Sequence, residues 1–172
     1  MGNTLLIGSC EPFSGKSALV LGLARHLLSE GRTVRFGKPL ATSLEWTAKG
    51  SPLPDPLIDD DVRFVGTTLG LDETRLIPSL HLLSPETADT RLRQGNLDAG
   101  TGLERLLKDL QNDQDSFTML EAAGSLHEGL MYGLSLVQLA QGLDAPVILV
   151  HLCKTAEALM PSSQHSISLA IA

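Results

Sequence analysis

Apolar residues follow two alternating patterns along this chain: short continuous runs, and longer stretches with helical spacing. The first run, Leu5-Leu6-Ile7, is typical of a buried strand. The residues after it predict a helix from about Lys16 to Glu30, which Gly31 ends, and then a strand over Thr33–Gly37. The apolar face of this helix consists of Val20, Leu23, Ala24, Leu27 and Leu28. A strand, helix and strand joined by short connections predict parallel strands with a right-handed crossover.

Two later runs, Ser116–Glu121 and Ala145–Val150, predict further buried strands. Strands that are apolar on both faces are typical of a parallel sheet covered by helices on both sides. Helical spacing between the strands predicts one helix after Asp59-Asp60-Asp61 and another within Gly129–Gly142. We therefore expect an α/β fold with three layers and a mostly parallel sheet.

The middle of the chain has helix-start signals. Ser84 followed by proline predicts an N-cap, and the spacing of Thr101 and Glu104 resembles a capping box. Arg91 and Arg93 lie near a predicted helix end, where solvated arginines are the expected interpretation and contact with a ligand anion is the alternative.

Composition narrows the function classes. A length of 172 residues suits one domain, residues 1–172. A net charge of -7 and an aromatic content of 3% argue against a broad nucleic-acid surface, which needs clustered cations and stacking rings. The first residues lack the positive region and long apolar run typical of a signal peptide, and no segment approaches the eighteen or so continuous apolar residues of a membrane span. We therefore expect a cytoplasmic protein that binds neither nucleic acid nor membrane.

The cysteines and histidines indicate neither a metal site nor a catalytic triad. Cys10 and Cys153 are far apart, so reduced thiols are the simplest interpretation and no zinc site is expected. His127 and His151 lack partners at a characteristic spacing and are interpreted as loop and strand-end histidines.

The tripeptide Gly15-Lys16-Ser17 stands where the first strand passes into the first helix. Glycine lets the backbone approach a phosphate, amide N–H groups cradle its oxygens, lysine neutralises the outer phosphates and the serine hydroxyl holds Mg²⁺. These residues, with the neighbouring Ser14 and Ala18, are the predicted nucleotide contacts. Six residues separate Gly8 from Gly15, where the common pattern has four. The alternative is a surface helix with Lys16 solvated.

Three more polar residues are expected near this loop. Lys38 follows the second strand, and the carboxyl ends of parallel strands share one ligand-binding edge. Asp61 and Glu121 supply carboxylates for Mg²⁺, with Ser17 as the third oxygen ligand. A solvated strand-end lysine, acids that only favour a helix N-terminus and an acid turned to solvent are the alternatives.

In order along the chain, the loop over 8–17, the segment Gly37-Lys38-Pro39-Leu40, the segment 59–64 and Leu120-Glu121-Ala122-Ala123-Gly124 resemble the dethiobiotin synthetase-like phosphate-loop family. Among its members, the N-terminal domains of long phosphotransacetylases and their stand-alone relatives are most similar. The resemblance covers about residues 3 to 150.

The resemblance implies that ATP and Mg²⁺ are the cofactors. It implies that Lys16 and Ser17 bind the nucleotide, that Lys38 lies at the reacting anion, and that Asp61 and Glu121 complete the metal site. Lys16 and Lys38 would then be the catalytic residues. Because related enzymes are dimers, the resemblance also implies a homodimer.

The chain departs from the synthetase in three places: its loop is one residue longer, Glu121 is followed by Ala-Ala-Gly, and residues 151–172 lack the turn that contacts adenine. We therefore expect a C-terminally abbreviated member. A nucleotide- or metabolite-sensing regulatory domain is the favoured function. The alternative is an ATP-dependent synthetase that activates a carboxylate or carbamate by phosphoryl transfer.

Overall fold

The computed structural model describes residues 3–44, 53–96, 99–113 and 115–152. Within these ranges, five strands form a parallel sheet in the order β4-β2-β6-β1-β7. They are β1 (Thr4–Ser9), β2 (Thr33–Gly37), β4 (Leu76–Ile77), β6 (Ser116–Glu121) and β7 (Val147–Val150). A second, two-stranded parallel sheet consists of β3 (Leu40–Ala41) and β5 (His81–Leu82).

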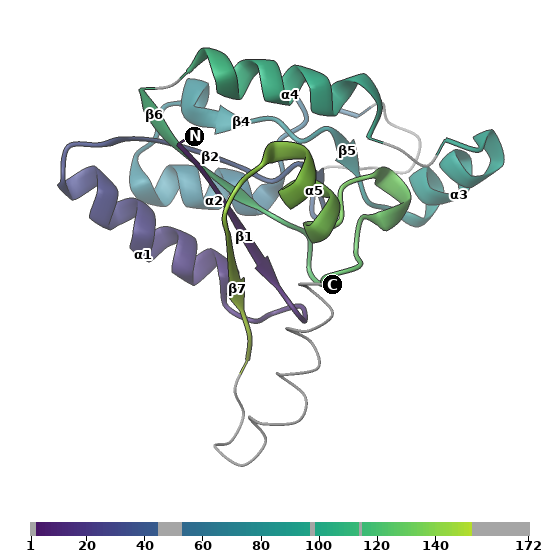
Figure 1. Ribbon diagram of the computed structural model, residues 1–172, viewed down its shortest axis with the longest axis horizontal. Helices are drawn as coiled ribbons and strands as arrows, with labels where there is room; N and C mark the ends of the chain where they lie inside the picture. Colours follow the sequence, from purple (N-terminus) through teal and green to yellow (C-terminus); the bar gives the residue numbers. More distant parts are fainter. Residues whose placement is uncertain (1–2, 45–52, 97–98, 114, 153–172) are drawn as a thin grey trace.

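The helices of the described residues are α1 (Lys16–Ser29), α2 (Asp60–Leu69), α3 (Pro85–Gln94), α4 (Gly100–Asn112) and α5 (Leu136–Leu143). Short 3-10 turns occupy Glu73–Arg75 and Leu130–Tyr132. Figure 1 shows the strands between α4 above and α1 below. The predicted first helix and the positions of the strands after it are thus confirmed, as is the α/β fold with a parallel sheet. The expectation that the last of these strands is buried is wrong, because Val147 is exposed and the rest of β7 is only half-buried.

The two faces of the sheet carry separate apolar cores because neighbouring strand residues point to opposite sides. Ile7 of β1 packs in one cluster with residues of α1 and α2, among them Val20, Ala24, Val62 and Val65. Its neighbour Leu6 packs in the other cluster with residues of α4 and α5, among them Leu106, Leu136 and Leu139. The sheet is therefore the middle of three layers, as the apolar strands predict.

The helix-start predictions have mixed outcomes. Ser84 caps α3 in a capping box with Thr87, as expected. The capping box at Thr101 is wrong, because α4 begins at Gly100 and its start has no side-chain cap. The solvated interpretation holds for Arg93 and is wrong for Arg91, which is buried with its guanidinium 4.8 Å from the centre of the Tyr132 ring. Propensity could not reveal this partner, because Tyr132 comes from a distant segment.

A buried arginine links β2 to the helix layer that contains α4. Arg35 is 8% exposed, and its guanidinium forms ion pairs with Asp109 in α4 and with Asp113 just after it. The hydrogen bonds that Ser116 gives Asp113 and the charge of Arg35 hold the pKa of this carboxyl below its usual value. In the described part of the chain, no helix is long and apolar enough to cross a membrane. Cys153 and the rest of 153–172 lie outside the described residues.

Candidate functional site

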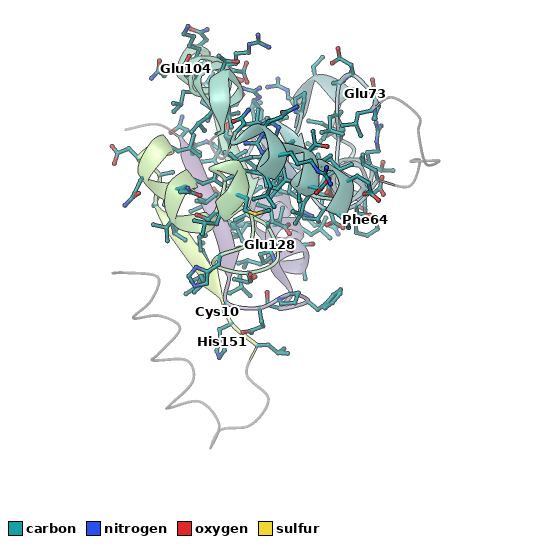
Figure 2. The ribbon with its side chains drawn as sticks, turned by 90° about the vertical axis from the view of Figure 1, so that its right-hand side faces the viewer. Cys10, Phe64, Glu73, Glu104, Glu128 and His151 are labelled. Carbon is teal, nitrogen blue, oxygen red and sulfur yellow. The ribbon has the colours of Figure 1, made fainter. Side chains whose placement is uncertain are left out.

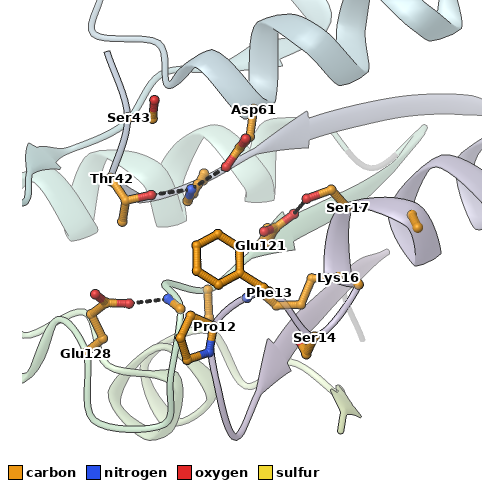
Figure 3. A pocket seen from close by; sticks show the side chains of 15 residues that line it. Pro12, Phe13, Ser14, Lys16, Ser17, Thr42, Ser43, Asp61, Glu121 and Glu128 are labelled. Carbon is orange, nitrogen blue, oxygen red and sulfur yellow. Dashed lines mark hydrogen bonds and ion pairs between the residues drawn. The ribbon is translucent and has the colours of Figure 1, made fainter. Parts of the chain in front are cut away.

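A cavity of about 690 Å³ lies at the carboxyl ends of β1, β2 and β6, where the topology of an open parallel sheet favours ligand binding (Figure 3). The loop after β1 and the first turn of α1 form one wall. Lys38 follows β2, Glu121 ends β6 and Asp61 stands in the first turn of α2. All eight predicted site residues line this cavity: Ser14, Gly15, Lys16, Ser17, Ala18, Lys38, Asp61 and Glu121.

The loop after β1 leads directly into α1, a helix whose start has no side-chain cap. Gly15, the N-cap of α1, has a φ of 94°, a left-handed conformation that glycine adopts at little cost, and no side chain caps this end. The first amide N–H groups of a helix have no partner within the helix and carry its positive dipole end. Here they lie beside the cavity, so this end of α1 has the geometry of an anion site.

Ser14 adds a further unsatisfied group. Within the described ranges, its Oγ is the buried side-chain oxygen for which no hydrogen-bond partner is found. A buried hydroxyl without a partner costs free energy, which a ligand oxygen at this position would recover. Phe13, next to it, has a φ of 56° and a ring that is 97% exposed at the cavity mouth.

Lys16 lies folded against the end of β1. Its Nζ is 2.9 Å from Ser9 Oγ and the residue is 7% exposed. Burial holds the pKa of this ammonium below its usual value, although the Glu121 carboxylate acts in the opposite direction. Ser9 Oγ is also close to the carbonyl oxygens of Glu11 and Gly124, at 2.9 and 3.0 Å. Ser9 therefore connects Lys16 to the loop after β1 and to the segment after β6.

Lys38 is held by two acids from the start of α2. Its Nζ lies 2.7 Å from Asp61 Oδ2 and 3.3 Å from Asp59 Oδ2, and it donates to Thr42 Oγ1. Burial alone would lower the pKa of this lysine, but the negative charges of Asp59 and Asp61 outweigh it and raise the pKa. Lys38 is thus a buried, charged ammonium at 4% exposure, and the solvated interpretation is wrong.

Glu121 lies opposite the helix start, 3% exposed, with Oε2 3.4 Å from Ser17 Oγ. Burial raises the pKa of this carboxyl to about 7, although Lys38 and Lys16 favour its charged form. The interpretation of an acid turned to solvent is therefore wrong. Ser17 and Glu121 offer oxygen ligands side by side, the type that Mg²⁺ prefers. Asp61 lines the same cavity but forms an ion pair with Lys38. It could therefore bind a metal ion only if its carboxylate is shared between the ion and Lys38.

Two residues that shape the site, Ser9 and Glu128, were given no role from the sequence, and Asp59 was expected only as one of three acids before a helix. Asp59 is fully buried and accepts backbone N–H groups of Asp61, Thr42 and Ser43, at 2.8, 2.7 and 3.1 Å. Its position directly before a helix was the available signal. Glu128 accepts the N–H of Gly124 across the cavity from α1 (Figure 3), and no motif marks it.

Comparison with known proteins identifies a family and a distant relative of this chain. Residues 3–158 match the family described as AAA domain. Over 174 aligned residues, 98% of this chain, the sequence is 28% identical to a phosphate acetyltransferase from Nitratidesulfovibrio vulgaris (strain Hildenborough). The match covers 23% of that relative, so this chain spans about a quarter of its length. The similarity inferred from the four motifs is confirmed.

Proposed function

Because this chain belongs to the AAA domain family, as a dethiobiotin synthetase-like phosphate-loop protein, we propose that it binds ATP with Mg²⁺ and acts as a nucleotide- or metabolite-sensing regulatory domain. The observation that carries the proposal is the uncapped start of α1 beside the cavity, together with the unpartnered Ser14 hydroxyl and two buried lysines.

The phosphate groups would lie over the start of α1. The amides of Gly15, Lys16, Ser17 and Ala18 and the hydroxyl of Ser14 would donate to phosphate oxygens. Lys16 would exchange its contact with Ser9 for a phosphate oxygen, which compensates the burial of its charge. Ser17 and Glu121, with Asp61 from α2, would hold Mg²⁺ directly or through water.

A regulatory role is supported by the partial coverage of the relative. The aligned region is 23% of a phosphate acetyltransferase, a size that suits an added domain more than the whole of that protein. In this role the domain would report nucleotide, or a small carboxylate metabolite beside it, to a partner. We also propose, from the family resemblance, a single cytoplasmic domain that forms a homodimer; light scattering during gel filtration tests its oligomeric state.

Lys38 favours a second candidate, an ATP-dependent synthetase that activates a carboxylate or carbamate. Its ammonium and that of Lys16 line the same cavity, both almost fully buried. Two cations and a metal ion arranged in this way would stabilise the charge that spreads over a transferring phosphoryl group. Lys38 would then lie at the acceptor and Lys16 at the outer phosphates.

Calorimetry on the purified chain tests nucleotide binding. Wild type should bind Mg²⁺-ATP at one site, and Lys16→Ala should weaken binding about tenfold or more, because a hydrogen bond to a charged group is lost. Lys108→Ala, an exposed lysine on α4, is the matched control and should bind like wild type. Absence of ATP binding, or equal affinities of wild type and Lys16→Ala, would overturn the proposal.

A second assay separates the two candidates. ADP release is measured from wild type with ATP, Mg²⁺ and a panel of small carboxylates and diamines with bicarbonate. A regulatory domain should bind ATP without releasing ADP above the rate in buffer. Release that depends on one acceptor and disappears in Lys38→Met would establish the synthetase instead.

A further inference from the structure

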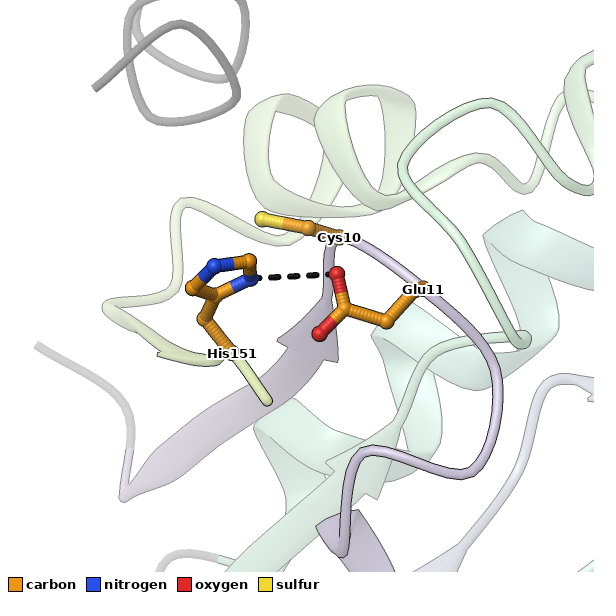
Figure 4. A group of neighbouring side chains, drawn as sticks. All are labelled: Cys10, Glu11 and His151. Atoms are coloured by element: carbon orange, nitrogen blue, oxygen red, sulfur yellow. Dashed lines mark hydrogen bonds and ion pairs between the residues drawn. The ribbon is translucent and has the colours of Figure 1, made fainter. Parts of the chain in front are cut away.

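A second group of polar side chains lies where β1 passes into the loop, beside the end of β7. The thiol of Cys10, the carboxylate of Glu11 and the imidazole of His151 each place one potential ligand atom within 4.8 Å of the other two (Figure 4). We call these three residues the Cys10 cluster. Figure 2 shows Cys10 and His151 at one end of the molecule, opposite Glu73 and Glu104.

Strand pairing brings the cluster together. β1 and β7 are parallel neighbours whose last residues, Ser9 and Val150, pair, so the residues that follow the two strands, Cys10 and His151, lie side by side. Glu11 then turns back toward β7: His151 Nδ1 is 3.0 Å from its Oε2, and the N–H of Leu152 donates to its Oε1. No sequence spacing indicated this cluster because 140 residues separate Glu11 from His151. His151 thus follows β7 as a strand-end histidine, as expected, but with Cys10 and Glu11 beside it.

We propose that the Cys10 cluster binds a Zn²⁺ ion. Thiolate sulfur, imidazole nitrogen and carboxylate oxygen are the ligand types that Zn²⁺ combines in proteins, whereas Mg²⁺ and Ca²⁺ select oxygen. A tetrahedral zinc ion needs donor atoms roughly 3.5 Å apart. Side-chain rotation would have to bring the three donor atoms from within 4.8 Å to this spacing, and the ion would replace the hydrogen bond between Glu11 and His151.

The exposure of the cluster suits an ion that enters from solvent. The side chains of Glu11 and His151 are 31% and 23% exposed, and Cys10 is half-buried against the core beneath α5. Three protein ligands leave a fourth position for water or another small ligand, as in zinc sites that are not purely structural. The site is therefore accessible and has one open coordination position.

Zinc binding here would act on the phosphate loop. Cys10 and Glu11 are the first loop residues after β1, and the Glu11 carbonyl is 2.9 Å from Ser9 Oγ, which contacts Lys16. An ion that joins this loop segment to the end of β7 would fix the backbone that precedes Ser14. The inference does not require nucleotide binding, so its test is independent of the proposed function.

Cobalt(II) is the probe, since it takes zinc sites and its thiolate bond gives a near-ultraviolet charge-transfer band. All variants carry Cys153→Ser, so that Cys10 is the remaining thiol, and excess Mg²⁺ occupies oxygen-only sites. The Cys153→Ser chain should bind one Co²⁺, show the band, and lose it when Zn²⁺ is added. Cys10→Ser should remove the band, and His151→Ala should weaken Zn²⁺ affinity about tenfold or more. Glu11→Gln should weaken it in the same direction.

The matched control is His127→Ala, which removes a loop histidine outside the cluster and should bind Co²⁺ like its parent. Circular dichroism melts of the metal-free variants verify that each is folded. If Cys153→Ser alone abolishes the band, or if folded Cys10→Ser and His151→Ala chains retain the parent's Zn²⁺ affinity, the proposal is wrong.

Discussion

Ser17 Oγ and Glu121 Oε2 lie 3.4 Å apart, although 104 residues separate them in sequence. The contact joins the start of α1 to the end of β6 across the cavity, at the place where a metal ion would bridge helix and strand. Removal of either oxygen should therefore affect the same quantity, the dependence of ATP affinity on Mg²⁺.

The contact between Ser17 and Glu121 predicts how ATP affinity depends on Mg²⁺. Ser17→Ala and Glu121→Gln should each bring Mg²⁺-ATP affinity close to that of ATP in EDTA, because each removes a ligand of one ion. The double variant should lose little beyond either single change, since residues that share one ion are not additive. Calorimetry with and without Mg²⁺ measures this. Fully additive losses would show that the two residues act separately.

Burial of Glu121 predicts a pH dependence of stability. Its pKa is raised from 4.5 to about 7, so the folded protein keeps a proton that the unfolded chain loses. The free energy of unfolding should therefore fall as pH rises through this window, by roughly 3 kcal/mol, and level off above it. Urea unfolding in EDTA measures the change. Glu121→Gln lacks the titrating group, so wild type should become less stable relative to this variant as pH rises.

Asp59 should be the most sensitive acid in the segment before α2. It is fully buried, pairs with Lys38 and accepts three backbone N–H groups, and an asparagine amide would turn a donor toward at least one of them. We expect Asp59→Asn to cost about 3–5 kcal/mol. Asp60→Asn is the matched control, since the partner of Asp60 is the exposed Ser43 hydroxyl, and it should cost about 0.5 kcal/mol or less. Equal unfolding midpoints would contradict this.

Gly37 should resist substitution because β4 passes directly beside it. A Cβ at this position would lie 2.5 Å from Ile77 Cβ and 2.9 Å from the Ile77 carbonyl oxygen, so a strand would have to move. Gly37→Ala should destabilise the fold by about 1–3 kcal/mol. Gly22→Ala, in α1 with open space around it, should instead stabilise by about 1 kcal/mol. Thermal melts of the two variants should move in opposite directions.

Local patterns predicted the parts of this molecule that local forces determine. The helix from Lys16 and the acid-rich start of α2 follow from spacing and capping, and the shared edge of Lys38 and Glu121 follows from parallel strand ends. Pairings across the fold were not predictable in this way. Nothing in the sequence near Arg91 indicates Tyr132, and nothing near Cys10 indicates His151, because each pair depends on which strands and turns become neighbours.

The strand order has a consequence for folding. β1 lies between β6 and β7, and its partner strands come more than a hundred residues later in the chain. The cavity walls at Ser17 and Glu121 therefore come together only after the long loops between these strands have closed, late along any folding route dominated by contact order. A nascent or partly unfolded chain would not hold nucleotide. Because nucleotide would bind only the folded chain, it would stabilise the whole fold by mass action. A rise in melting temperature with nucleotide concentration would therefore measure binding at this site.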